Sequence, residues 1–222
     1  YQAIFFDDST FFAKSKYYMR GLVGLLQKHD FEWGCQTTQN SVHKMADLLP
    51  EMTKSGLKYV YMGIEHYDGH MRDSFGKSIG GGNKFNGHAV EDTLKILHDN
   101  RINTGISLTF GHPDPGSPEE ATRETKTTAS YSIDRTAELM SQFPNVGGVS
   151  LNLITYHPGT PNSERYEKKV GSLDYTTHPN KREPFTSFEE GIGQHPKGMT
   201  PELAEHILSY AKQKIPGEKL WI

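Results

Sequence analysis

The sequence predicts an α/β fold with a parallel sheet, and three observations support this. Short apolar runs typical of strands occur five times along the 222 residues. Each run stops at a polar or glycine-containing segment, and a helical pattern follows it or is expected there. A strand–helix repeat of this kind builds a parallel sheet, in which chemistry gathers at the carboxyl ends of the strands. A chain of this length fits one large α/β domain.

The five segments at which the predicted strands end are called the strand tips, and they contain the candidate functional residues. The strands are expected at about 3–6, 31–35, 57–64, 105–110 and 146–154. The strand tips are Asp7-Asp8, Cys35-Gln36-Thr37, Gly63-Ile64-Glu65, Gly111-His112-Pro113 and Tyr156-His157-Pro158-Gly159-Thr160.

Helices are expected between these strands and near the end of the chain, at about 14–28, 42–52, 90–97, 117–142 and 200–215. Their apolar residues recur every three or four positions, as on the buried face of an amphipathic helix. Asn40-Ser41 is the expected N-cap of the second helix, and Gly56 is its expected stop. The apolar run 57–64 alternates poorly, which predicts a central strand covered on both faces.

The chain is expected to divide near residue 161. Residues 1–161 contain the strand–helix repeat. Residues 162–198 show little periodicity and many Pro, Gly and charged residues, which predicts a loop of unusual length. We therefore expect 162–222 to form a long loop and a C-terminal helix that packs on the first domain.

Composition excludes several classes of protein. The net charge of −3 and the scattered Lys and Arg residues give no broad basic face, so no nucleic-acid partner is expected. No apolar run approaches the roughly 18–20 residues of a membrane span, so a cytoplasmic protein is expected. Cys35 is the single cysteine, and we expect it to be a small packed residue. Because the chain begins at Tyr1 inside a strand-like run, a fragment or a processed product is expected.

Taken one at a time, the strand tips have more than one interpretation. Asp7 or Asp8 could bind a divalent cation or an ammonium group, or could cap the next segment. Glu65 ends the most apolar strand, so its carboxylate needs a ligand or a cationic partner. A histidine in this chain is most simply exposed or hydrogen-bonded, but His112 and His157 are better candidates because both occupy strand tips.

Taken in order, the strand tips resemble the radical S-adenosylmethionine (radical SAM) superfamily, most closely the subgroup with cobalamin-binding relatives. The matching segments are Phe5–Phe11, Trp33–Thr37, Met62–Glu65, Gly105–Glu120 and Tyr156–Pro161. The resemblance covers about residues 1–161. It implies a partial (β/α)6 barrel of the TIM type with parallel strands, whose N-terminal strand and CxxxCxxC cluster loop are absent from this chain.

The resemblance also implies which residues bind cofactors. Asp7 and Asp8 match the strand tip that often binds the methionine amino group, although two Asp residues replace the usual Gly-Gly-Glu. Glu65 falls near the ribose hydroxyls, and the segments around Phe110 and Ile154 fall beside the adenine. The implied cofactor-binding residues are Asp7, Asp8, Gln36, Gly63, Glu65, Phe110, Gly111, His112, Ile154, Tyr156, His157 and Pro158.

The implied activity is reductive cleavage of S-adenosylmethionine to a 5′-deoxyadenosyl radical that abstracts a hydrogen atom from a small-molecule or peptide substrate. The implied cofactors are S-adenosylmethionine and a 4Fe–4S cluster whose ligands lie outside this chain, and cobalamin is a third candidate. Without the cluster loop, this chain alone is expected to be inactive.

Two alternative functions remain open. A metal-dependent hydrolase or lyase would use Asp7 or Asp8 with Glu65, His112 and His157 as ligands. A non-catalytic remnant would bind a partner or small ligand through the same strand tips. Because the first strand is expected to be missing, the run Ala3–Phe6 is expected to lie at an open sheet edge through which the protein could self-associate.

Overall fold

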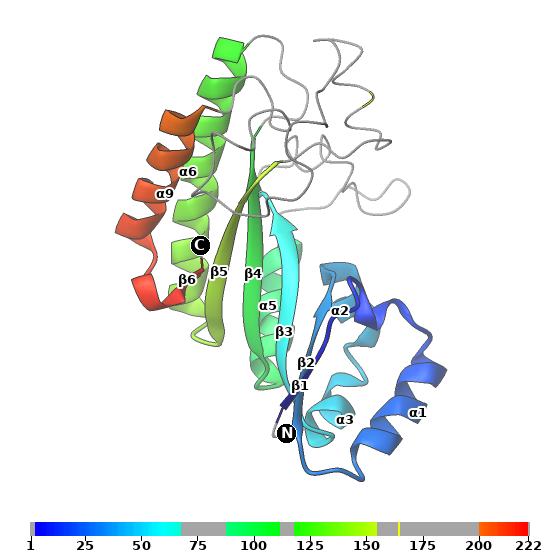
Figure 1. Cartoon of the computed structure of the whole chain (residues 1–222). Coiled ribbons are helices and arrows are strands. Elements are labelled where there is room, and N and C mark those ends of the chain that lie inside the picture. Colours follow the sequence, from blue (N-terminus) through cyan, green and yellow to red (C-terminus); the bar gives the residue numbers. More distant parts are fainter. Residues whose placement is uncertain (1–2, 68–87, 112–117, 155–163, 165–199, 222) are drawn as a thin grey trace. The chain divides into compact units, whose positions relative to one another are not determined.

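The computed structural model describes residues 3–67, 88–111, 118–154, 164 and 200–221. Its strands form one six-stranded sheet in the order β1-β2-β3-β4-β5-β6, so every strand lies beside its neighbour in the sequence (Figure 1). The strands are β1 Ala3–Phe6, β2 Glu32–Thr37, β3 Leu57–Glu65, β4 Asn103–Phe110, β5 Val146–Leu153 and β6 Leu220–Trp221. This parallel, sequentially ordered sheet confirms the predicted α/β class.

Helices follow the strands as the apolar periodicity predicts. They are α1 Lys16–Leu26, α2 Gln39–Met45, α3 Leu49–Lys54, α5 His88–Asp99, α6 Pro118–Gln142 and α9 Pro201–Lys214, with short 3-10 turns at Phe11–Ala13 and Gly217–Lys219. The sequence did not predict β6, because two residues are too few to show a pattern.

Two compact units make up the chain. The first comprises Tyr1–Ile64, Asn86–Ser107 and Glu138–Val149, and the second comprises Glu65–Phe85, Leu108–Ala137 and Ser150–Ile222. None of the points at which the chain passes from one unit to the other coincides with residue 161, and the predicted division there stays a prediction. In the first unit, α1, α2 and α3 gather with β1 and β2 (Figure 1).

The first unit has a buried sheet face and a half-buried one. Parallel pairing aligns Cys35 of β2 with Val60 of β3, and both side chains are fully buried. On β3, Leu57, Val60, Met62 and Ile64 are buried, whereas the tyrosines between them are only half-buried. The predicted central position of β3 is therefore confirmed, but coverage of both its faces is not complete.

Two details of the helices differ from the prediction. Thr38 is the N-cap of α2, since its Oγ1 accepts a hydrogen bond from the Ser41 amide at 3.4 Å. The predicted helix 42–52 is two helices, and Pro50 lies at the start of the second. Proline lacks an amide proton and favours the first helical turn, so the chain restarts there. Gly56, with φ +101°, ends α3 as predicted.

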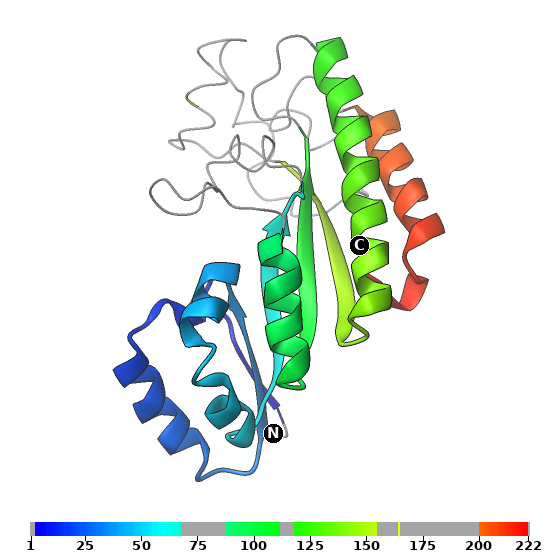
Figure 2. The same ribbon diagram turned by 180° about the vertical axis from the view of Figure 1, so that it is seen from behind.

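The second unit includes a pair of helices that lie side by side (Figures 1 and 2). Tyr210 of α9 donates its hydroxyl to the Asp134 carboxylate of α6 at 2.9 Å, and Lys214 lies 3.1 Å from the same carboxylate. The Lys214 ammonium and the Tyr210 hydroxyl hold the pKa of Asp134 below its usual range. The predicted C-terminal helix is thus present and is tied to α6.

Candidate functional site

The strand tips of β1 and β2 share a hydrogen bond. Asp7 Oδ1 accepts from Gln36 Nε2 at 3.0 Å. Asp7 is exposed and Gln36 half-buried, so both polar groups remain within reach of a ligand. Asp8 instead accepts from the Thr10 amide at 3.2 Å and lies 3.5 Å from Lys14 Nζ. Asp8 therefore closes a local turn with Thr10, and its predicted part in cofactor binding stays a prediction.

Two polar atoms near the tip of β2 are buried without partners. Thr37 Oγ1 and Gln39 Oε1 have no hydrogen-bond partner within the described structure. The Gln39 amide nitrogen donates to the Gly63 carbonyl at 3.4 Å, which connects the tips of β2 and β3. A buried polar atom without a partner is rare, so this part of the tip can accept a further polar group. Gln39 was not among the predicted site residues because it lies beyond the strand tip.

Glu65 ends β3 in the left-handed region of backbone space. Its φ is +64°, a conformation that costs a non-glycine residue about 1–2 kcal/mol. Its Oε2 atom accepts a hydrogen bond of 2.7 Å from Thr109 Oγ1 on β4. The side chain is half-buried. The predicted partner for this carboxylate was a ligand or a cation, and the structure supplies a neutral hydroxyl as one partner.

A buried polar network on α6 supports the residues after Glu65. His66 is fully buried, and its Nδ1 lies 3.2 Å from Ser132 Oγ. The Tyr67 amide donates to the same Oγ atom at 3.3 Å. Thr136 Oγ1 donates to the Tyr67 hydroxyl at 3.4 Å, and burial raises the pKa of Tyr67 to about 12. The His66 ring lies edge-on to Phe110 at 6.1 Å.

The tips of β4 and β5 are joined through their backbones. The Ile154 amide donates to the Phe110 carbonyl at 2.7 Å. Phe110 is 1% exposed, so its ring packs inside and cannot offer a face to a ligand. Gly111 follows with φ +120°, which a side chain would strain. Glu65, Phe110, Gly111 and Ile154 all belong to the second unit.

Several predicted site residues lie outside the described residues. They are His112, Tyr156, His157 and Pro158. The metal hypothesis depends on two of these and stays a prediction. Among the residues that the structure describes, no group of three His, Cys, Asp or Glu side chains could hold a metal ion.

The residues of this chain do not fit an iron–sulfur cluster. Cys35 is the single cysteine of the sequence, and its side chain is fully buried. Burial raises the pKa of the Cys35 thiol well above its usual range, so it stays protonated, whereas cluster ligands are thiolates. The prediction that Cys35 is a packed residue is confirmed.

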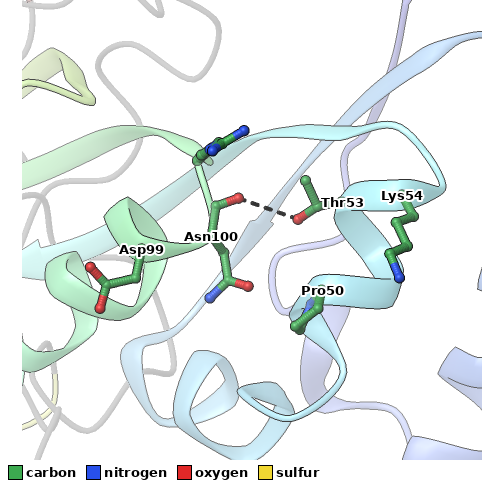
Figure 3. Close-up of a pocket in the computed structure, with 6 residues that line it drawn as sticks. Pro50, Thr53, Lys54, Asp99 and Asn100 are labelled. Atoms are coloured by element: carbon green, nitrogen blue, oxygen red, sulfur yellow. Dashed lines mark hydrogen bonds between the residues drawn. The ribbon is translucent and has the colours of Figure 1, made fainter.

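Two hollows in the first unit lie away from the strand tips. One of about 320 Å³ lies where α3 and α5 end, beside Thr53, Lys54 and Asn100, and therefore near the amino ends of the following strands (Figure 3). The other, of about 250 Å³, lies beside Phe5, Gly34 and Tyr59. Chemistry in parallel sheets concentrates at the opposite, carboxyl ends, so neither hollow is the leading candidate.

No helix in the described part of the chain is long and apolar enough to cross a membrane. No protein-family profile matches the sequence, and no curated protein matches it.

Solved structures do match the fold. Coproporphyrinogen III oxidase (HemN) from Escherichia coli, a radical SAM enzyme, matches 98% of the chain with a TM-score of 0.61 and 14% identity. The radical SAM methyltransferase TsrM from Kitasatospora setae, solved with cobalamin and a 4Fe–4S cluster, matches 92% with a TM-score of 0.56 and 18% identity. The same methyltransferase with tryptophan and a SAM analogue matches 95% with a TM-score of 0.60 and 15% identity.

These matches confirm the predicted fold relationship, because all three structures are radical SAM enzymes. The chain spans between 37% and 43% of the length of these matched chains. At this level of identity the likeness concerns the fold.

Proposed function

We propose that this chain, whose fold is that of the radical SAM enzymes, is the S-adenosylmethionine-binding part of such an enzyme. The observation that supports the proposal most is Glu65. A half-buried carboxylate at a strand tip adopts a strained left-handed conformation and is held there by Thr109. Strain of this kind persists where the surrounding structure fixes it, and it concentrates at functional sites.

The residues of the second unit suit the adenosine half of the ligand. A carboxylate accepts two hydroxyl protons well, so Glu65 would bind the ribose diol. Gly111 leaves room for the backbone to approach the adenine, and Ile154 provides an apolar contact beside it. Phe110 would act through packing rather than by stacking on the base, because its ring is buried.

The first unit, considered by itself, also contains a candidate binding pair. Asp7 with Gln36 offers an exposed carboxylate beside a half-buried amide, a pair that suits an ammonium group. Asp8 has a smaller part in this proposal, since its carboxylate already binds Thr10 and Lys14.

S-adenosylmethionine supplies a sulfonium whose one-electron reduction releases a radical able to abstract hydrogen from a substrate. The electron would have to come from a group held elsewhere, since the thiol of Cys35 does not fit a cluster. What this chain contributes is binding and orientation of the adenosyl group and exclusion of water from it. A small molecule or a peptide is the proposed class of substrate for the whole enzyme.

Ligand binding by the 222-residue chain tests the proposal. In isothermal titration calorimetry we expect S-adenosylhomocysteine to bind to the unmodified chain. Glu65→Gln should lower the affinity about tenfold, because charge-assisted hydrogen bonds to the ligand are lost. Glu205→Gln on α9 is the matched control and should bind as the unmodified chain does. Equal affinity of the Glu65→Gln variant, or no binding by the unmodified chain, would overturn the proposal.

Two further measurements separate the alternatives. Metal analysis of the purified chain should show no stoichiometric zinc or manganese; metal retained through Asp7 and Glu65 would favour the hydrolase instead. Titration with cobalamin tests the third cofactor, which we keep as a candidate because one matched structure contains it.

A further inference from the structure

Three consecutive residues, Glu65, His66 and Tyr67, are each held by a side chain from another element. Thr109 on β4 donates to Glu65, while Ser132 on α6 contacts both His66 and the Tyr67 amide. Ser132 is fully buried. A short segment fixed at each of its three residues cannot relax its backbone at one of them without breaking contacts at the others.

The Ser132 hydroxyl can form hydrogen bonds with two neighbours at once. Its Oγ atom accepts the proton of the Tyr67 amide at 3.3 Å, so its own proton is available for the His66 ring nitrogen 3.2 Å away. An uncharged imidazole nitrogen can accept that proton. Ser132 and His66 are fully buried, and Tyr67 is 8% exposed. The loss of one of these hydrogen bonds would therefore leave a buried polar atom without a partner.

The neighbouring side chains of α6 reinforce the same arrangement. Thr136 lies one helical turn after Ser132 and donates to the Ser132 carbonyl at 2.8 Å. It also approaches the Tyr67 hydroxyl at 3.4 Å. Ser132 and Thr136 therefore form one buried stripe of α6 that contacts His66 and Tyr67.

We infer that Ser132 is a positioning residue, which holds Glu65 in the conformation that binds its ligand. By bonding to the His66 ring and the Tyr67 amide, it holds Glu65 in the left-handed conformation from which the carboxylate meets Thr109. In its absence the segment is free to relax to an ordinary extended conformation, which would turn the carboxylate away from Thr109. The ligand class, a ribose diol, rests on the proposed function. The effect of Ser132 on the conformation of Glu65 is independent of that function.

A double-mutant cycle on the whole chain tests this inference. Ser132→Ala should lower the affinity for S-adenosylhomocysteine about tenfold when Glu65 is present. In the Glu65→Gln variant the same substitution should lower it by less than about twofold. Thr125→Val removes a different buried hydroxyl from α6 and is the matched control, expected to leave affinity unchanged. If Ser132→Ala weakens binding equally in both backgrounds, Ser132 is merely structural and the inference is overturned.

A second measurement does not depend on the ligand. The NMR three-bond coupling between the amide and α protons of Glu65 reports its φ angle, and hydrogen exchange reports protection of the Tyr67 amide. In Ser132→Ala we expect the coupling to change and the Tyr67 amide to exchange faster. If the unmodified chain binds no S-adenosylhomocysteine, the proposed function fails, and these readings alone decide the inference. An unchanged φ at Glu65 would overturn it in any case.

Discussion

The strand tips of β1 and β3 both present a carboxylate, but the two are supported in different ways. Asp7 is exposed and has one described partner, the amide of Gln36. Glu65 is half-buried, has a positive φ and is followed by a fully buried histidine tied to α6. An acidic residue at a strand tip is therefore weak evidence for function until its conformation and its supporting contacts are known.

The largest expected effect is on the buried support of β3. His66→Ala removes a fully buried ring and its contact with the Ser132 hydroxyl, so the free energy of unfolding should fall by about 3 kcal/mol. His29→Ala, at an exposed position, should change it by less than about 0.5 kcal/mol. Urea unfolding measures both, and similar losses would show that the network around His66 contributes little.

The next effect separates strain from function. Arg101 also has a positive φ, +57°, so Arg101→Gly should stabilise the chain by about 1 kcal/mol. Glu65→Gly relieves similar strain but also loses the Thr109 hydrogen bond, so its gain should be smaller. Only Glu65→Gly should abolish S-adenosylhomocysteine binding. A loss of stability in Arg101→Gly would contradict the idea that a left-handed residue is costly here.

A smaller effect concerns the exposed face of α6. Asp134→Asn breaks the ion pair with Lys214, and the melting temperature should fall by only about 1 °C because exposed ion pairs contribute little. Scanning calorimetry measures this change. Ligand affinity should not change, which would confirm that Ser132, rather than the whole helix, controls Glu65.

The same ion pair predicts a pH dependence. The folded-state pKa of Asp134 is lowered. The stability that its carboxylate contributes is therefore fully present above the unfolded-state pKa of about 4, and it is lost as pH falls through the lowered pKa. The folded-state pKa of Lys214 is raised, mainly by Asp134. The stability that its ammonium group contributes is therefore fully present below the unfolded-state pKa of about 10.4, and it is lost as pH rises through the raised pKa. Proteolysis of α9 should therefore be slowest between these limits, and Asp134→Asn should remove the dependence.

The smallest expected effect concerns β1 itself, which is the edge of the described sheet. Ile4 is 39% and Phe5 46% exposed, and we propose that this edge allows weak self-association. Light scattering at increasing concentration should show it, and Phe5→Lys should reduce it. A strictly monomeric protein would mean that another element protects the edge.

Much of the fold could be predicted because apolar patterns are local. Five strands and the main helices follow from runs and periodicities within about ten residues. The break between α2 and α3 was missed although Pro50 signals it, because the buried stripe continues through Leu49 and Met52. The two-residue β6 leaves no pattern to find.

The candidate site could be predicted only in part. Glu65 was identified from its place at the end of an apolar strand, but its left-handed conformation was not, since glutamate rarely adopts it. The role of Ser132 could not be found, because it lies 66 positions from His66 and looks like any other serine in a helix. Contacts between residues so far apart depend on the tertiary fold.

The sequential order of the strands has a consequence for how the protein folds. Each strand docks on the one that precedes it, and the longest connection to be closed runs from Leu153 of β5 to Leu220 of β6. Parallel sheets form slowly because loop-closure entropy is lost before the strands pair, and this loss grows with loop length, so we expect β6 to pair last. A chain shortened at either end would then lose its outermost strands while the remaining ones still pair.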